Sequence, residues 1–152
     1  MFKKISIHYV IFILAIGALT VVMLFLRSGQ QDSFNATAVL KGGSLEVPVA
    51  LADTTALRQH GLSDTASLPA GVGMLFVFPA PAVQGFWMKD MQYPLDIVWM
   101  DSAMTVVGIA SNVMPDTYPQ VFYSPAPVQY VLEVNAGYAQ MHGIAVGKQF
   151  TL

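Results

Sequence analysis

The 152-residue chain contains no cysteine. This absence excludes disulfide bonds, thiolate metal sites, cysteine nucleophiles and attachment of a lipid through cysteine. Charged residues are also scarce, at 11% of the chain, whereas apolar residues make up 55%. The stability of the fold must therefore come from burial of apolar side chains.

Basic residues are few in the part of the chain that follows Arg27. This part holds four basic residues against nine acidic ones, a formal balance of −5. Because nucleic-acid binding usually needs a basic patch or stripe, the sequence predicts no nucleic-acid partner. His60 and His142 lie far apart and show no zinc-site spacing, so neither a metal nor another cofactor is predicted.

The N-terminal region has no charged residue between Ile5 and Leu26. These 22 residues would span roughly 33 Å as a helix, enough to cross a bilayer core of about 30 Å. Lys3 and Lys4 precede this run, and the positive-inside rule places residues 1–4 in the cytoplasm. The sequence predicts a single-pass anchor over residues 5–26 in the cytoplasmic membrane, with the rest of the chain periplasmic or extracellular.

A cleaved secretory signal is the alternative for this region. Its apolar part is usually only ~7–15 residues long and ends in a small-x-small cleavage site. The run here is longer, and no such triplet occurs near Arg27. An uncleaved signal anchor is therefore the favoured interpretation.

The region after the anchor divides into a polar linker, residues 27–36, and a globular domain, residues 37–152. Short apolar runs separated by turn residues predict strands, and Asp53 and Thr54 with Gly61 predict a short helix between them. The expected strands cover residues 37–40, 45–51, 73–78, 97–101, 105–109, 130–135 and 148–152. Pro79-Ala80-Pro81 is expected to end the third, and residues 111–127 form a long loop. The pattern predicts a mainly β (α+β), antiparallel and barrel-like small domain, monomeric, with one or two short helices.

The segment from Gly85 to Asp96 concentrates polar and aromatic residues in a charge-poor chain. Strand alternation would place Trp87 and Lys89 on one face, where an aromatic plane beside an ammonium suits a sugar or an anionic small molecule. The alternative is a core tryptophan with a lysine that extends to solvent. Asp96 either belongs to the site or caps free backbone N–H groups.

Glu133 lies inside an apolar strand, where an unpaired carboxylate would be costly. We expect it to be mostly buried and hydrogen-bonded, with Lys89 or a backbone N–H as its partner. Such a pair would be either a structural ion pair or a perturbed acid suited to proton transfer.

Several of these segments together resemble the DUF192 family, also called UPF0127. The resemblance runs from about Val47 to the C-terminus and is carried by Gly61-Leu62, Gly73-Met74-Leu75-Phe76, Phe86-Trp87-Met88-Lys89, Pro94-Leu95-Asp96-Ile97 and Leu132-Glu133-Val134-Asn135-Ala136-Gly137. It implies a small, mostly β domain of the exported or membrane-anchored kind. The function of that family is not established, so the resemblance implies no reaction.

Three functions remain open at this point. The first is a membrane-anchored module that binds a small ligand or a glycan, with the 111–127 loop over its pocket. The second is an enzyme that acts on an envelope glycan, and the third is a scaffold for an envelope protein. The residues predicted to bind a ligand are Trp87, Lys89, Tyr93, Asp96 and Asn135; those predicted to be catalytic are Glu133, Asp96 and Lys89.

Overall fold

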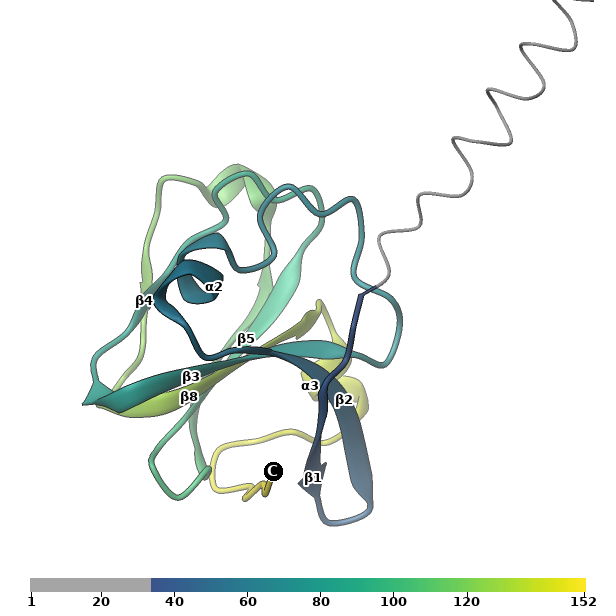
Figure 1. Cartoon of the computed structure of the whole chain (residues 1–152), viewed down its shortest axis with the longest axis vertical. Coiled ribbons are helices and arrows are strands. Elements are labelled where there is room, and N and C mark those ends of the chain that lie inside the picture. Colours follow the sequence, from purple (N-terminus) through teal and green to yellow (C-terminus); the bar gives the residue numbers. More distant parts are fainter. Residues whose placement is uncertain (1–33) are drawn as a thin grey trace, which may run out of the picture. The chain divides into compact units, whose positions relative to one another are not determined.

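A computed structural model describes residues 34–152 (Figure 1). The predicted anchor and most of the linker lie outside the described residues. The eight strands of the described part are β1 (Ala38–Gly42), β2 (Leu45–Ala52), β3 (Gly73–Ala82), β4 (Gly85–Phe86), β5 (Leu95–Met100), β6 (Val106–Val113), β7 (Phe122–Tyr123) and β8 (Val128–Asn135). Its helical elements are α2 (Thr55–His60), the 3-10 turn η1 (Pro115–Thr117) and α3 (Tyr138–Met141).

The strands form a six-stranded sheet in the order β1-β2-β3-β8-β5-β6 and a two-stranded sheet of β4 and β7. The prediction of a mainly β domain with short helices is confirmed. The expected antiparallel arrangement needs one correction, because β2 and β3 run parallel. Parallel neighbours need a crossover connection, and residues 53–72, which include α2, provide it.

Several predicted elements form where the sequence places them. Helix α2 begins after Thr54, whose hydroxyl accepts a hydrogen bond from the Leu57 N–H at 3.2 Å. It ends at Gly61, whose φ of 55° favours glycine. Strands β5 and β6 form the predicted hairpin, and the Asp101 carboxylate accepts hydrogen bonds from the backbone of its turn.

Other elements differ from the prediction. Strand β3 continues through Pro79 and Pro81 to Ala82. The prolines are tolerated because the β3–β8 pairing stops at Val77 and resumes at Ala82, so neither proline removes a ladder hydrogen bond. The long 111–127 segment is also partly structured, since it contains the end of β6, the η1 turn and β7.

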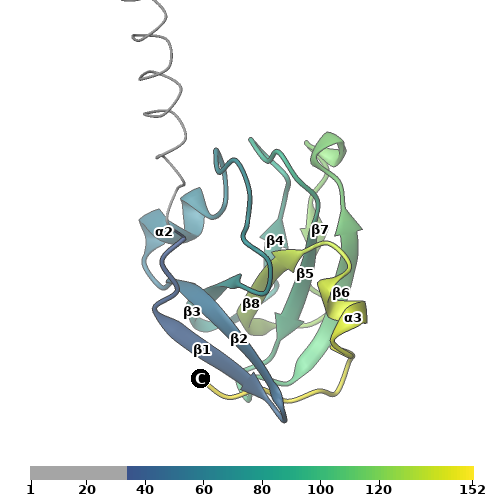
Figure 2. The same ribbon diagram turned by 90° about the vertical axis from the view of Figure 1, so that its right-hand side faces the viewer.

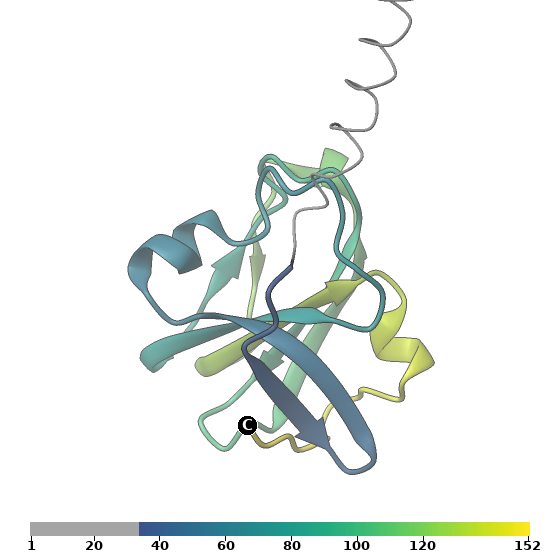
Figure 3. The same cartoon turned by 45° about the vertical axis from the view of Figure 1, so that its right-hand side comes forward.

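The C-terminal residues predicted as a strand form only isolated bridges. Lys41 and Thr151 exchange two backbone hydrogen bonds of 2.8 Å, and the Val106 N–H donates to the Lys148 carbonyl at 2.9 Å. The C-terminal chain therefore contacts both β1 and the β5–β6 hairpin (Figure 3). These bridges are not a ladder, so the predicted barrel-like closure is corrected to a mixed sheet with edges at β1 and β6.

Apolar side chains cover both faces of the six-stranded sheet. Every residue of β5 is buried, and its side chains alternate between two hydrophobic clusters. The first cluster includes Leu40, Val98, Leu132, Val134 and Phe150. The second includes Leu62, Phe76, Ile97, Trp99 and Val131. Helix α2 and the β4–β7 pair lie on one side of the β3–β8 ribbon and the C-terminal chain on the other (Figures 1 and 2).

No helix within residues 34–152 combines the length and the apolar character that a membrane crossing requires.

Candidate functional site

Glu133 is placed by β8 on the face of the sheet that carries the second cluster. Its register partners are Met74 on β3 and Ile97 on β5, and all three side chains point to this face. Only 5% of Glu133 is exposed, so the prediction that it is buried is confirmed.

The Glu133 carboxyl group has no hydrogen-bond or ion-pair partner within residues 34–152. The ion pairs in this part of the chain are Lys41–Glu46 at 3.5 Å and Lys89–Asp90 at 3.9 Å, both on the surface. The prediction that Glu133 pairs with Lys89 or with a backbone N–H is therefore wrong for residues 34–152. Burial raises the pKa of Glu133 from 4.5 to about 8, because removal from water penalises the charged form. The side chain is mostly a neutral carboxylic acid at pH 7.

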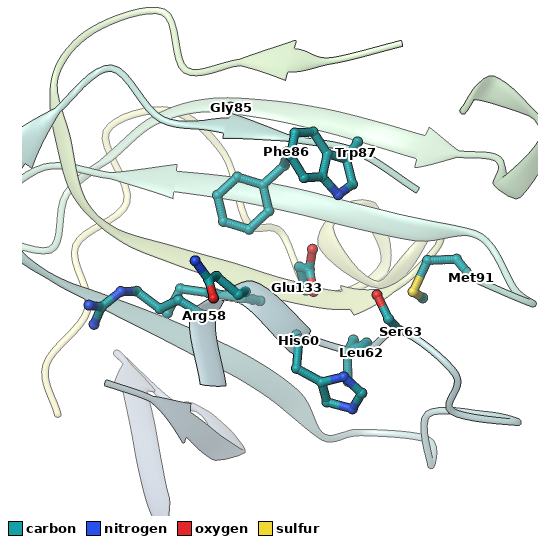
Figure 4. Close-up of a pocket in the computed structure, with 12 residues that line it drawn as sticks. Arg58, His60, Leu62, Ser63, Gly85, Phe86, Trp87, Met91 and Glu133 are labelled. Carbon is teal, nitrogen blue, oxygen red and sulfur yellow. The ribbon is translucent and has the colours of Figure 1, made fainter. Parts of the chain in front are cut away.

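A pocket of ≈ 90 Å³ lies over this carboxyl group. Polar side chains of residues 58–60 and of Ser63 line part of it, and its apolar and aromatic walls are Leu62, Phe76, Phe86, Trp87 and Met91. Figure 4 shows the Glu133 carboxyl directed toward Phe86 and Trp87. The pocket therefore joins one buried acid to several aromatic and apolar side chains.

The basic side chain at the edge of the pocket is held away from the acid. Arg58 Nη1 donates to the carbonyl oxygens of Asp53 at 2.6 Å and Val77 at 2.8 Å. Its guanidinium also lies 5.5 Å from the centre of the Phe78 ring. In Figure 4 it points away from Glu133. Arg58 consequently does not neutralise the carboxylate.

Trp87 forms the accessible rim of the pocket. It is 53% exposed, so the alternative of a core tryptophan is wrong. Strand β4 ends at Phe86, and the following residues belong to a loop in which Asp90 has a φ of 57°. The Ser63 hydroxyl donates to the Lys89 carbonyl at 3.0 Å, which ties this loop to the residues after α2.

Asp96 lies on the opposite face of the sheet from Glu133. Its register partner on β8 is Val134, the neighbour of Glu133, and successive side chains of a strand alternate between faces. Asp96 is 0% exposed and accepts hydrogen bonds from the Asn112 N–H at 2.8 Å and the Ala139 N–H at 2.9 Å. The interpretation of Asp96 as a backbone cap is confirmed.

Tyr93 and Asn135 hold the chain between α2 and β3. The Tyr93 hydroxyl shares a hydrogen bond with the Thr65 hydroxyl, and Asn135 Nδ2 donates to the Leu68 carbonyl at 3.0 Å. Burial raises the pKa of Tyr93 above 10.0, the charge of Glu133 adds to this rise, and the bond to Thr65 opposes it.

The structure brings only part of the predicted site together. Glu133 and Trp87 share the pocket, whereas Tyr93 does not line it, Lys89 faces solvent and Asp96 lies on the opposite face of the sheet. His60, Ser63 and Met91 also line the pocket and were not predicted. The one sequence signal for them was Gly61-Leu62, which lies between His60 and Ser63 in the family resemblance.

No cluster of three or more metal-binding side chains occurs in the part of the chain that the structure describes.

A comparison with family models matches residues 37–152 to DUF192, described as Uncharacterized ACR, COG1430. The match covers most of the chain. The chain belongs to the DUF192 family. No match is found among curated proteins.

Two solved structures resemble this DUF192 protein in fold and sequence. A protein of unknown function from Novosphingobium aromaticivorans DSM 12444 is 30% identical, with a TM-score of 0.69 over 75% of this chain and 82% of the other. A candidate transcription regulator from Sinorhizobium meliloti 1021 is 31% identical, with a TM-score of 0.69 over 74% of this chain and 89% of the other. The fold of the domain is therefore shared with these two proteins.

Proposed function

We propose that this protein is a membrane-anchored, extracytoplasmic module that binds a small ligand or a glycan in the pocket above Glu133. The observation that carries the proposal is the Glu133 carboxyl, which is 5% exposed and opens into a pocket without a partner from the described residues. A buried polar group without a hydrogen bond costs roughly 1–3 kcal/mol, and more when it is charged. A bound ligand would supply the missing partner.

The size of the pocket limits what enters it. Ligand pockets usually measure about 300–1,000 Å³, whereas this one measures ≈ 90 Å³. It therefore suits one protruding group of a larger ligand. The rest of that ligand would lie against Trp87, whose indole offers an apolar plane and an N–H donor.

The proposal that the domain lies outside the cytoplasmic membrane, in the periplasm or the extracellular space, rests on the sequence. Residues 5–26 carry no charge and follow Lys3 and Lys4, which favours an anchor with a cytoplasmic N-terminus. We further propose that the protein is a monomer and that it does not bind nucleic acid. The excess of acidic over basic residues after Arg27 supports the second of these.

The geometry gives less support to an enzyme that uses Glu133 and Asp96 together on a glycan. Paired carboxylates in glycoside hydrolysis flank one bond and lie ~5–9.5 Å apart. Here the two carboxylates belong to opposite faces of the sheet, and the hydrogen bonds of Asp96 serve the backbone. Glu133 is the one acidic side chain that lines the pocket, so binding is the better-supported function.

A scaffold role is a second candidate, favoured by exposed aromatic side chains outside the pocket. Tyr118 and Tyr123 are both exposed on the segment that follows β6. Aromatic side chains of this kind commonly anchor protein partners. Replacement of both by alanine should abolish co-purification of an envelope partner if this role is correct.

The proposed binding function is tested by ligand screening with matched variants. The full chain in neutral detergent would be screened against envelope glycans and small metabolites by thermal shift. A true ligand should stabilise the wild-type chain but not Glu133→Gln or Trp87→Ala. Tyr118→Ala, an exposed aromatic outside the pocket, should retain the shift. Equal shifts for all four proteins would contradict the assignment of the pocket.

A further inference from the structure

The acid of the pocket, Glu133, has no ion-pair partner among residues 34–152. Arg58 is bonded to carbonyl oxygens and to the Phe78 ring, and Lys89 lies 3.9 Å from Asp90 on the surface. The strands that flank β8 contribute only Met74 and Ile97 opposite Glu133. Arg58 and His60, both from α2, are the other ionisable side chains that line the pocket.

Three aromatic rings, those of Phe76, Phe86 and Trp87, belong to the remaining wall. Phe76 and Phe86 meet edge to face, with ring centres 4.9 Å apart, and Trp87 continues this surface to the rim. The faces of aromatic rings carry a negative quadrupole and attract cations, by about 0.5–2 kcal/mol for each favourable contact. The carboxylate and the rings therefore favour the same sign of charge in a ligand.

Anionic and neutral ligand groups would bind this pocket less favourably than cationic ones. An anion would meet the Glu133 carboxylate, which repels it once ionised. A neutral hydroxyl could pair with the protonated acid but would gain nothing from the ring quadrupoles. A cationic group gains from the rings and from a charge-assisted hydrogen bond or ion pair with the carboxylate.

We propose that the pocket binds the ammonium end of an organic amine, with Glu133 as its counter-ion and Phe86 and Trp87 as its aromatic walls. This inference rests on the proposed binding function and names the chemical class of the ligand. The pocket of ≈ 90 Å³ admits the charged end of such a molecule and leaves the remainder beside Trp87.

Binding of a cation is coupled to loss of a proton from Glu133. With the pKa of the free carboxyl at about 8, the pocket holds a neutral acid at pH 6.5. The O–H proton must pass to solvent before the carboxylate can pair with the ammonium group. Affinity should therefore fall about tenfold for each pH unit below about 8, and be independent of pH well above it.

The test uses a permanent cation and a neutral molecule of the same shape. Choline and 3,3-dimethyl-1-butanol would be titrated calorimetrically into the full chain in neutral detergent, in buffers of different ionisation enthalpy. We expect choline to bind at least tenfold more tightly than the alcohol. It should release close to one proton at pH 6.5 and almost none at pH 9.5. Ethanolamine and a lysine-containing peptide, compared at pH 7.5, show whether a free amine or a protein side chain is the better ligand.

Matched variants distinguish choline binding in the pocket from nonspecific attraction to the acidic protein surface. Glu133→Gln should lose choline binding and proton release, whereas Asp116→Asn, which removes a surface acid of η1 outside the pocket, should retain both. Equal affinity for choline and the alcohol, binding without proton release, or no binding of any ammonium compound overturns the amine assignment. If a glycan still binds in a Glu133-dependent way, only this assignment fails; if no screened ligand binds, the binding function fails as well.

Discussion

Two buried carboxyl groups, one on each face of the same sheet, differ in their hydrogen bonding. Asp96 accepts two backbone hydrogen bonds, whereas Glu133 accepts none from the described residues and faces an open pocket. The two hydrogen bonds of Asp96 provide acceptors for the backbone N–H groups of Asn112 and Ala139. Asp96 is therefore part of the framework, and Glu133 is the residue to examine for function.

The first prediction concerns the pH dependence of stability. The pKa of Glu133 is higher in the folded state, about 8, than its ordinary value of 4.5. The folded protein thus binds more protons between these values, and the free energy of unfolding falls as pH rises from 4.5 to about 8. At about 1.4 kcal/mol per pKa unit, the loss amounts to roughly 5 kcal/mol at most. Urea denaturation of the full chain at pH 5, 7 and 9 measures it.

The Glu133→Gln variant provides the control for this prediction, because its amide does not titrate. From pH 5 to pH 9 the free energy of unfolding of the wild type should fall relative to that of the variant, so the variant gains in relative stability. A constant difference across this range would show that the carboxyl group is solvated.

The second prediction concerns Asp96. Replacement by alanine leaves the N–H groups of Asn112 and Ala139 without their acceptor. Because hydrogen bonds to a charged group contribute about 1.5–3 kcal/mol each, the unfolding free energy should fall by roughly 3 kcal/mol or more. Asp96→Asn, which retains one acceptor oxygen, should lose about half as much. Equal losses for the two variants in urea denaturation would contradict the capping role.

For single residues, the sequence predicts whether a side chain is buried better than it predicts which groups the side chain contacts. The apolar neighbours of Glu133 correctly predicted that it is buried, and its place before a strand correctly suggested a cap for Asp96. The sequence could not show that these carboxylates face opposite sides, because this depends on the register between β5 and β8. Nor could it show that Lys89 turns to solvent, which depends on the loop after β4.

At the scale of elements, the C-terminal chain connects parts of the sheet that are distant in sequence. Its residue Phe150 is buried against the first cluster, and the Phe150 N–H donates to the Met104 carbonyl at 3.0 Å. The ring also fills the space beside Gly42, where an added Cβ would lie 2.6 Å from it. This segment stabilises the sheet through one buried aromatic residue and a few bridges.

The third prediction follows from this arrangement. Phe150→Ala should lower the free energy of unfolding by about 3–5 kcal/mol, the usual loss for a buried aromatic residue. Leu152→Ala is the matched control, because Leu152 is exposed at the end of the same segment. Chemical denaturation of both variants compares them, and similar losses would mean that the terminal segment does not pack as described.

The regular elements were predictable because their signals are local. Helix α2 has its cap residues within its own sequence, and the β5–β6 hairpin has two apolar runs around a short turn. The extension of β3 through its prolines was not predictable, since it depends on a gap in the pairing with β8. The bridging of the C-terminal chain likewise depends on residues distant in sequence, since Thr151 pairs with Lys41 and Gln149 with Thr105.

At the scale of the whole molecule, the described part forms a compact unit from Phe34 to Leu152 with hydrophobic clusters of its own. The fourth prediction is that this part folds without the N-terminal segment. A chain that begins at residue 34 should be a monomer with a strand-dominated circular dichroism spectrum and a cooperative thermal transition. A helical spectrum or the absence of a transition would contradict this expectation.

The fifth prediction concerns the orientation of the chain in the membrane. Alkaline phosphatase fused after Leu152 should be active, because the enzyme requires an extracytoplasmic environment and Lys3 and Lys4 favour a cytoplasmic N-terminus. Replacement of both lysines by glutamate should reduce this activity. Activity only from a cytoplasmic reporter at the same position would reverse the assigned topology.

The two tryptophans of the chain lie in opposite environments, which makes each a separate spectroscopic probe. Trp87 stands at the rim of the pocket and is mostly in water, whereas Trp99 is buried in the second cluster with its indole N–H unpaired. Iodide should therefore quench the emission of Trp87 while that of Trp99 stays blue-shifted and protected until the domain unfolds. Intrinsic fluorescence of one unlabelled sample can consequently report occupancy of the pocket and integrity of the interior as two distinct signals.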